Sequence, residues 1–182
     1  MLKIAITLPD AIDGEVAAIR QLLADGIDIV HLRKPEAGID YCRMLLEQLT
    51  SVERAQIVVH DYYVLYEEFM LRGVHQNKNI GHLPDGYRGS RTHSCHSFEE
   101  VLRYKEESDY LFLSPIFDSI SKRGYRSAFS HEDLQRAADT GIIDNRVVAL
   151  GGVTCDKIAY LESLHFGGVA MSGALWTTHS LK

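Results

Sequence analysis

Short apolar runs alternate with amphipathic segments along the whole chain. The apolar runs predict strands over Lys3–Leu8, Ile27–Arg33, Gln56–His60, Gly73–Gln76, Thr92–His96, Tyr110–Ser114, Arg146–Leu150 and Gly168–Ser172. Helical periodicity predicts helices over Gly14–Ala24, Asp40–Ser51, Tyr62–Arg72, Phe98–Glu107, His131–Thr140 and Thr154–Leu164. This alternation predicts an α/β fold with a parallel sheet, and eight strands favour a closed (β/α)₈ (TIM) barrel. A doubly wound sheet is the alternative, because short apolar runs are easily over-counted as strands.

Two stretches make this predicted barrel compact. Residues 77–91 hold three glycines and a proline, which predicts a reduced fourth helix. Ten residues follow Ser172, so the last helix is expected to be short or absent. The chain has no linker or low-complexity segment, and we predict a single domain over residues 1–182. Uncovered strands favour a homodimer, in which a partner subunit covers them.

The charge and cysteine content limit the classes of partner. A formal net charge of -6 argues against nucleic acid and against an anionic membrane, although local cations can still bind a phosphorylated small molecule. The three cysteines, Cys42, Cys95 and Cys155, form no CxxC pair, which favours a reduced, cytoplasmic setting. The first residues are too quickly polar for a signal peptide, and no apolar run approaches the roughly 18 residues of a membrane span.

Polar residues follow the second and third predicted strands, where a barrel of this class places its reactive groups. Strand alternation turns His31 and Arg33 the same way, with Leu32 opposite, and two such cations suit an anionic ligand. Asp61 follows the third strand. It fits either a Mg²⁺ ligand or the N-cap of a helix that starts at Tyr62.

The fifth predicted strand carries histidines and hydroxyls. Ser94 and His96 share one face of the strand. Ser97 with Glu100 fits a capping box, S-x-x-E. A zinc site built from His93, Cys95 and His96 is disfavoured, because adjacent strand positions face opposite ways.

Hydroxyls, cations and glycines follow the last three strands. The long loop after the sixth strand contains Ser119, Ser121 and Lys122, which suits a phosphate clamp or, alternatively, a basic surface loop. Gly151-Gly152 follows the seventh strand, and glycines flank the eighth. Loops at these two positions form the recurring phosphate site of the fold, although glycine turns also occur for structural reasons.

Seven segments, in order along nearly the whole chain, resemble one enzyme family. They are VHLRK, VVHD, GVH, SCHSFEE, SPIFDSISK, VVALGGV and GGVAMSGAL. The sequence thus resembles the family of thiamine phosphate synthase and thiazole tautomerase. The synthase reaction that this resemblance implies is loss of pyrophosphate from hydroxymethylpyrimidine diphosphate, supported by Mg²⁺, with attack by the nitrogen of thiazole phosphate.

The resemblance also implies roles for individual residues. Lys122, Arg33 and His96 are the predicted catalytic residues. Asp61 is the predicted ligand of one Mg²⁺ ion, whose coordination the substrate diphosphate completes. The diphosphate substrate is expected to meet His31, Arg33, Lys34, His60, Ser94 and Lys122. Thiazole phosphate is expected to meet Ser119, Ser121, Gly151, Gly152, Met171 and Ser172.

The chain departs from the synthase pattern on the pyrimidine side. The synthase has Gln where His31 stands and Asn where His60 stands, and its Lys lies at the position of Pro35, next to Lys34. Its second metal-binding Asp is missing around Asn79 and Ile80.

These departures favour a tautomerase, in which His96 shuttles the proton, as an alternative. A non-catalytic binder of thiamine-related phosphates is a further alternative. Lys122 and the loop hydroxyls favour the synthase.

Overall fold

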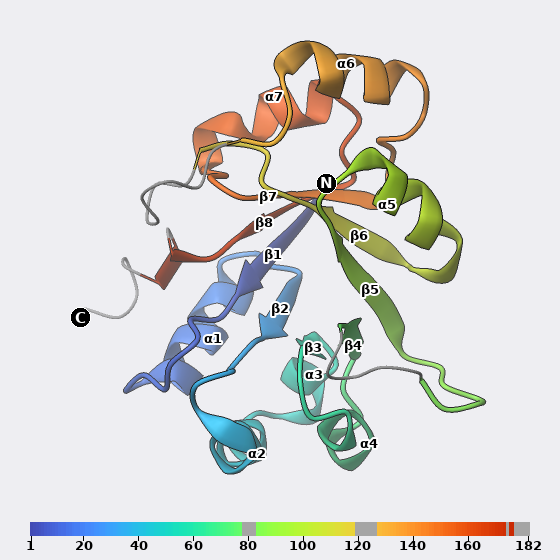
Figure 1. Ribbon diagram of the computed structural model, residues 1–182. Coiled ribbons are helices and arrows are strands. Elements are labelled where there is room, and N and C mark those ends of the chain that lie inside the picture. The colour runs from blue at the N-terminus through green and yellow to red at the C-terminus, as the bar shows by residue number, and fades with distance from the viewer. Residues whose placement is uncertain (78–82, 119–126, 174, 177–182) are drawn as a thin grey trace. The chain divides into compact units, whose positions relative to one another are not determined.

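The computed structural model describes residues 1–77, 83–118, 127–173 and 175–176, and its strands form a closed parallel barrel in chain order (Figure 1). The strands are β1 (Leu2–Ile6), β2 (Ile29–Leu32), β3 (Ile57–Val59), β4 (Gly73–Gln76), β5 (Ser90–Cys95), β6 (Tyr110–Leu113), β7 (Val147–Leu150) and β8 (Gly168–Met171). The helices are α1 (Glu15–Ala24), α2 (Gly38–Gln48), α3 (Ser51–Arg54), α4 (Val64–Phe69), α5 (Phe98–Tyr104), α6 (His131–Asp139) and α7 (Ile158–Ser163). The predicted (β/α)₈ barrel is confirmed, and each strand ends within two residues of its predicted bounds.

Local backbone geometry explains where the helices differ from prediction. The segment predicted as one helix over Asp40–Ser51 divides at Leu49, and Thr50 starts α3 with a capping box to Glu53. α4 starts two residues later than predicted, because Tyr62 has a left-handed φ of 59°. Its N-cap is Tyr63, which makes no side-chain cap, so the alternative that Asp61 caps a helix starting at Tyr62 is wrong.

Two stretches that were predicted to carry little helix are described in part. Between β4 and β5, the described residues 77 and 83–89 contain no helix. The last helix is represented among the described residues by a turn that starts at Gly173. Short 3₁₀ turns at Lys105–Glu107 and Cys155–Lys157 complete the predicted helical segments around α5 and α7.

The chain divides into two compact units. The N-terminal unit comprises residues 4–91 and 172–182, and the C-terminal unit comprises residues 1–3 and 92–171. In the N-terminal unit one face of the strands packs on α1, α2 and α4. The buried residues of this core include Val30, Leu32, Val59 and Val74 from the strands and Leu22, Leu46 and Leu65 from the helices. Trp176 joins the same core, and its Nε1 donates a hydrogen bond to Ile6 O at 2.7 Å.

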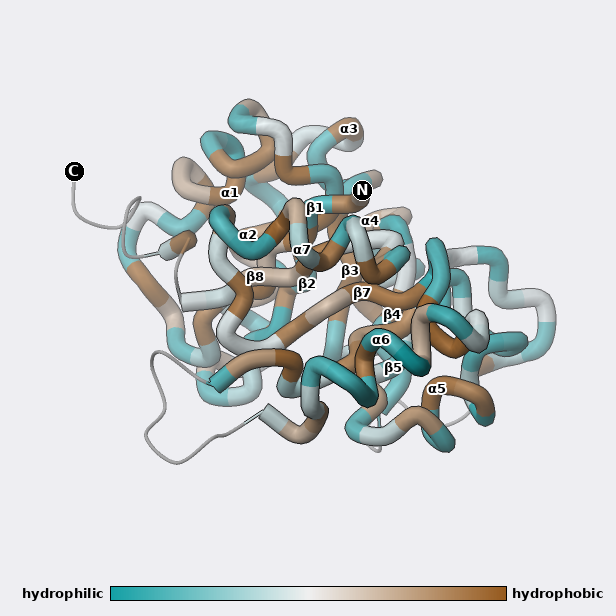
Figure 2. Tube along the Cα trace, turned by 90° about the horizontal axis from the view of Figure 1, so that it is seen from above, coloured by the Kyte–Doolittle hydropathy of each residue, from teal (hydrophilic) through white to brown (hydrophobic). Residues whose placement is uncertain are grey.

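In the C-terminal unit, α5, α6 and α7 lie along one side of β6 and β7 (Figure 1). Polar and apolar positions alternate along α6 (Figure 2), and its buried residues are Leu134, Ala137 and Ala138. Ser130 and Asp133 form a capping box at the start of this helix. The polar face of α6 therefore stays exposed while its apolar stripe packs inward.

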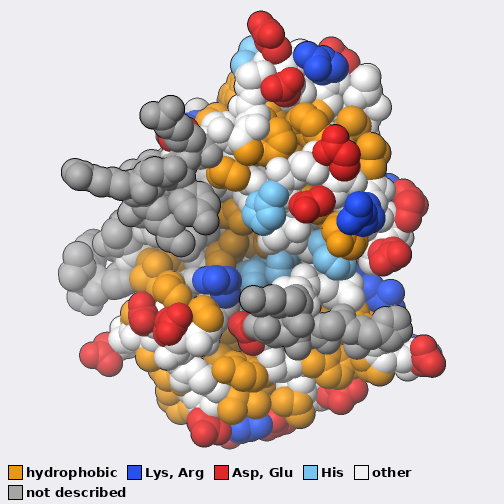
Figure 3. All heavy atoms as spheres, viewed as in Figure 1, with side chains coloured by type: hydrophobic (Ala, Val, Ile, Leu, Met, Phe, Trp, Pro, Cys, Tyr) orange, Lys and Arg blue, Asp and Glu red, His pale blue; other side chains and the backbone are white. Residues whose placement is uncertain are grey.

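No helix in the described ranges is long and apolar enough to cross a membrane. On the face shown in Figure 3, acidic and basic side chains are interspersed among the side chains drawn in colour.

Candidate functional site

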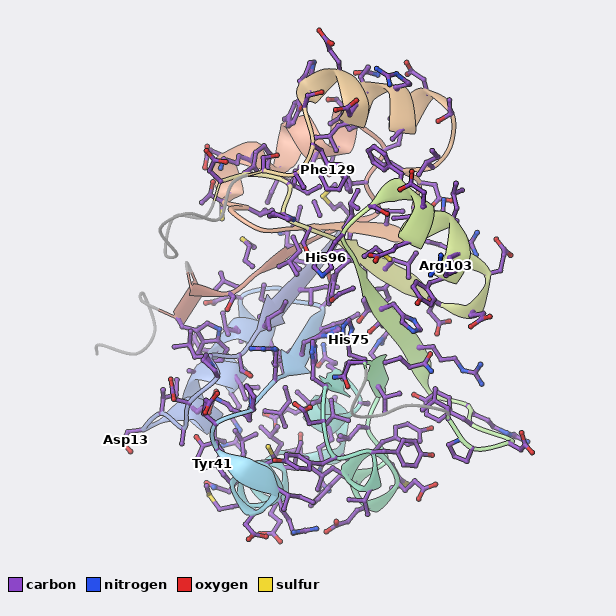
Figure 4. All side chains as sticks on the ribbon, viewed as in Figure 1. Asp13, Tyr41, His75, His96, Arg103 and Phe129 are labelled. Carbon is purple, nitrogen blue, oxygen red and sulfur yellow. The ribbon has the colours of Figure 1, made fainter. Side chains whose placement is uncertain are left out.

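Strand register brings three histidines of the N-terminal unit onto one face. His31 in β2 pairs with Val58 in β3, and Val58 pairs with Gly73 in β4. Paired residues of parallel strands face the same way, and side chains repeat with a period of two. His60 and His75 therefore face the same side as His31, opposite the side that packs on the helices. Figure 4 shows His75 at the end of β4.

The three imidazoles are in mutual contact; we call them the imidazole cluster. His31 Nδ1 lies 2.8 Å from His60 Nε2, a hydrogen bond between two rings. The rings of His60 and His75 stack, with centroids 4.1 Å apart and planes at 18°. All three residues are buried: His31 is fully buried, and His75 and His60 are 3% and 6% exposed.

Burial disfavours the charged forms of His31 and His60. It lowers the pKa of His31 and of His60 well below the ordinary value of 6.5, and the neighbouring His75 lowers both further. The guanidinium groups of Arg72 and Arg33 add to this effect on His31 and His60 respectively. Neutral rings accept as well as donate hydrogen bonds, so this face suits a polar heterocycle or a metal ion.

Arg33 directly follows the last residue of β2, and its side chain is exposed. Its backbone is held on both sides by the buried Thr7, whose Oγ1 accepts from Arg33 N at 2.9 Å and donates to Arg33 O at 3.0 Å. The guanidinium has no hydrogen-bond or ion-pair partner in the part of the chain that the structure describes. This positive charge is therefore available to an anionic ligand, and its contact with a diphosphate stays a prediction.

Lys34, by contrast, has a buried side chain that forms an ion pair. Its side chain is 0% exposed, and its Nζ lies 2.6 Å from Glu15 Oε1 and donates to Asp10 O at 2.6 Å. Tyr41, on α2 (Figure 4), donates to the other Glu15 oxygen at 2.7 Å. The predicted contact between Lys34 and a substrate is corrected: strand alternation turns this side chain into the network with Glu15, where it is a structural ion pair.

Asp61 follows β3 and is half-buried. It does not belong to a group of three or more converging His, Cys, Asp or Glu side chains, since the imidazole cluster is the group of that kind found among the described residues. The adjacent His60 is anchored through its carbonyl, which accepts from Asn77 Nδ2 at 2.5 Å. Asn79 and Ile80, where the second metal-binding Asp was sought, lie outside the described residues.

In the C-terminal unit, Ser94 lies in β5 and His96 directly follows its last residue, Cys95. His93 faces the helices, because its ring stacks on Tyr104 of α5 with centroids 4.6 Å apart. His96 Nδ1 lies 3.0 Å from Ser114 O, so the ring donates there and leaves Nε2 as its acceptor. Ser97 Oγ accepts from Glu100 N at 3.2 Å, which confirms Ser97 as the helix N-cap. The reciprocal bond of the predicted capping box is not formed, because Glu100 Oε2 accepts from His96 N at 2.6 Å.

The glycine turn after β7 packs closely against the residues that follow β6. Gly151 and Gly152 have φ of 94° and 62°, which glycine adopts without strain. A Cβ on Gly152 would lie 2.4 Å from Asp118 O and 2.8 Å from Phe117 Cβ. The N–H groups of the two glycines donate no hydrogen bond within the described residues, which leaves two donors for an anion.

The base of the loop after β6 is fixed against this turn. Phe117 N donates to Gly151 O at 3.0 Å, and Asp118 Oδ1 accepts from Ser127 N at 2.7 Å. Asp118 and Ser127, the described residues on either side of segment 119–126, are therefore joined by a hydrogen bond. Within that segment, the predicted Ser119, Ser121 and Lys122 lie outside the described residues. Of the remaining predicted thiazole-side residues, Met171 ends β8 with its side chain buried, and Ser172 accepts from Leu175 N at 2.9 Å.

Sequence reasoning missed two residues beside these groups. His75 completes the imidazole cluster; the segment GVH contained it, but alternation within one strand does not show which residues of neighbouring strands it meets. Lys157 donates to Gly152 O at 2.6 Å, and its ammonium lies 4.2 Å from the ring centroid of Phe117. Lys157 thus places a positive charge beside the glycine turn, and no local sequence pattern indicates that contact.

Comparisons with known proteins agree with one another. A family model described as thiamine monophosphate synthase matches residues 4–175. Thiamine-phosphate synthase of Bacteroides fragilis is 26% identical over an alignment of 171 residues that covers 86% of this chain and 82% of that protein. The crystal structure of thiamine phosphate pyrophosphorylase from Bacteroides thetaiotaomicron is 37% identical, with a TM-score of 0.87 over 97% of this chain and 85% of that one. A thiamine phosphate pyrophosphorylase from Pyrococcus furiosus, 22% identical over 95% of this chain and 86% of that one, has the same fold with a TM-score of 0.72.

Proposed function

Because the chain belongs to the thiamine monophosphate synthase family, we propose that it joins hydroxymethylpyrimidine diphosphate to thiazole phosphate. In this reaction the bond between the pyrimidine methylene carbon and the diphosphate oxygen breaks, and pyrophosphate leaves with the electron pair. The thiazole nitrogen then forms the new C–N bond with its lone pair. The observation that carries the proposal is the family match over residues 4–175.

The N-terminal unit supplies the groups proposed for the diphosphate substrate. Arg33 has an exposed guanidinium on a backbone that Thr7 fixes, which suits bidentate contact with a phosphate group. His31 and His60 offer neutral imidazoles to the polar edge of the pyrimidine. Because these rings are buried and mutually bonded, they hold fixed orientations before a substrate arrives.

The C-terminal unit supplies the groups proposed for thiazole phosphate. The N–H groups of Gly151 and Gly152 are donors of the kind that bind phosphate after the seventh strand of such a barrel. Ser119 and Ser121 are proposed to add hydroxyl donors, and Lys122 to compensate the charge that develops on the leaving pyrophosphate. On the grounds of strand-end position and resemblance, Ser94 is proposed to contact the diphosphate substrate and His96 to act as a catalytic residue.

Asp61 is proposed to hold one Mg²⁺ ion. A half-exposed carboxylate at a strand end is a suitable oxygen donor, but it is a single protein ligand among the described residues. Mg²⁺ accepts so few protein ligands because it retains waters and uses substrate phosphates. When bound, the ion neutralises charge on the diphosphate. Coordination of Mg²⁺ at Asp61 therefore depends on the substrate diphosphate, and we expect weak binding of Mg²⁺ when that substrate is absent.

An assay of thiamine phosphate formation, with and without EDTA, tests the proposal. We expect activity that requires Mg²⁺ and both substrates. Lys122→Ala should lower turnover by roughly 10²–10³ while binding of thiazole phosphate is retained, because one charge-stabilising donor is lost. Asp61→Asn should abolish activity. Arg103→Ala is the matched control, since this exposed cation lies on α5 (Figure 4) and should leave turnover unchanged.

Other outcomes of the same assay would overturn the transferase. Isomerisation of a thiazole carboxylate phosphate that persists in EDTA and disappears in His96→Ala would assign a tautomerase. Stabilisation by thiazole phosphate without turnover of either substrate set would assign a binder. A cytoplasmic location and a homodimer stay predictions, and light scattering of the purified protein tests the latter.

A further inference from the structure

We propose that His31, His60 and His75 form a binding site for a divalent transition-metal ion such as Zn²⁺. This site is different in ligand chemistry from the Mg²⁺ site proposed at Asp61. It goes beyond the proposed transferase function and does not depend on it, because the site is formed by side chains of the N-terminal unit alone.

The first argument is convergence. One ligand atom from each imidazole lies within 4.8 Å of the others, and the three residues come from the ends of adjacent parallel strands. With Zn–N bonds of about 2.0–2.1 Å, tetrahedral coordination separates two ligand nitrogens by roughly 3.3 Å. His31 Nδ1 and His60 Nε2 are 2.8 Å apart, so these nitrogens must separate by about half an ångström while His75 approaches. Side-chain torsions can supply such movements without a change of register.

The second argument is the chemical identity of the donors. A metal ion binds a ring nitrogen through its lone pair, and the three buried imidazoles bring such nitrogens together. Imidazole suits zinc, copper, nickel and iron, whereas magnesium prefers oxygen. The ring that donates in the bond between His31 Nδ1 and His60 Nε2 must present a lone pair to the ion, so its proton moves to the other nitrogen of the same ring and the imidazole stays neutral.

The third argument concerns the remaining coordination position. Three protein ligands leave a fourth position open in tetrahedral geometry. Arg33 and Arg72 act electrostatically on the cluster, so the site carries positive charge from its surroundings. The fourth ligand is therefore expected to be an anion, such as hydroxide or a phosphate oxygen, and inorganic phosphate should strengthen binding of the metal.

The test uses the full-length protein after removal of metals with a chelator. Co²⁺ is titrated in, and the intense visible absorption of four-coordinate Co²⁺ is recorded, with Zn²⁺ then added as competitor and Mg²⁺ as control. We expect one equivalent of Co²⁺ to produce the band, stoichiometric Zn²⁺ to remove it, and excess Mg²⁺ to leave it unchanged.

The double variant His31→Gln/His60→Asn is the decisive protein. It places at these positions the side chains of the synthase pattern, so the fold is expected to tolerate it, and circular dichroism checks this. His75→Gln is the second variant, which removes one ligand with little change of volume. Both should lose the Co²⁺ band. His93→Gln is the matched control: this half-buried histidine faces α5 in the other unit and should leave the band intact.

Two results would overturn the proposal. Wild-type protein that gives no four-coordinate Co²⁺ spectrum at one equivalent, with or without phosphate, would show that the imidazoles do not accept a metal ion. A band that survives in the folded double variant would place the metal at other side chains. Because no substrate is present, loss of transferase activity in a separate assay affects neither conclusion.

Discussion

Replacing Gly152 with alanine should destabilise the protein and weaken binding of thiazole phosphate. Gly152 has a φ of 62°, and a Cβ there would lie 2.4 Å from the carbonyl oxygen of Asp118. Gly141 offers a matched control, because its φ is 73° and a Cβ there would meet no heavy atom within 4 Å. Both substitutions place a residue with a Cβ in the left-handed conformation, which is strained. Only the substitution at Gly152 also requires the loop after β6 to move.

The two costs can be separated. The left-handed backbone of an alanine costs roughly 1–2 kcal/mol at either position. Overpacking adds about 1–3 kcal/mol where surrounding atoms must shift, which applies to Gly152→Ala. We therefore expect Gly141→Ala to lower the free energy of unfolding by about 1–2 kcal/mol and Gly152→Ala by roughly 2–5 kcal/mol.

Urea denaturation followed by circular dichroism measures the free energy of unfolding, and calorimetric titration measures binding of thiazole phosphate. Gly141→Ala should bind thiazole phosphate like the wild type. Gly141 lies between the end of α6 and the start of β7, whereas the candidate phosphate site follows the carboxyl end of β7. If both variants lose the same stability, the close approach at Asp118 does not matter energetically. If folded Gly152→Ala binds thiazole phosphate with unchanged affinity, the glycine turn is not the phosphate site.

Three further perturbations test individual contacts. Lys34→Met should lower the free energy of unfolding by about 3–5 kcal/mol in urea titrations, because it leaves the buried Glu15 carboxylate unpaired; adding Glu15→Leu should recover part of that loss. Trp176→Phe should cost roughly 1–3 kcal/mol by the same measurement, because the carbonyl of Ile6 loses its donor. Burial lowers the pKa of His93 below 6.5, so the unfolded chain binds more protons there and stability should fall as pH drops below about 6.5. Melting temperatures against pH should show a shallower fall for His93→Gln, and equal slopes would contradict this assignment.

The fold was predictable because its information is local. Most strands are apolar runs, and the longer helices carry an amphipathic period, so the order of elements follows from the chain alone. The errors arose where one residue's backbone overrides the period. Tyr62, in a left-handed conformation, delays α4, and Leu49, with extended backbone, divides the second predicted helix. Side-chain patterns do not report such dihedral angles.

The candidate site was predictable in part. Alternation along β2 correctly placed Leu32 in the core that packs on the helices, opposite His31. The position of His75 in the imidazole cluster depends on the stagger between β3 and β4, which a single sequence does not reveal. Lys34 was assigned to a substrate because its ion-pair partner, Glu15, lies in α1, far from it in the sequence. An ion pair between such distant residues leaves no local sequence pattern.

Two of the departures from the synthase pattern, His31 and His60, create the imidazole cluster together with His75. Gln and Asn at positions 31 and 60 would offer amides to a pyrimidine and no ligand to a transition metal. Histidines there keep hydrogen-bonding capacity, since a neutral ring both donates and accepts, and they add metal affinity. Recognition of the pyrimidine and binding of a metal ion are therefore separable properties of one face. The variant His31→Gln/His60→Asn separates them, because it removes the metal ligands while it retains donors and acceptors for the heterocycle. A variant that makes thiamine phosphate but binds no Co²⁺ would show that the histidines serve the metal, and one that loses both would show that the heterocycle needs the rings themselves.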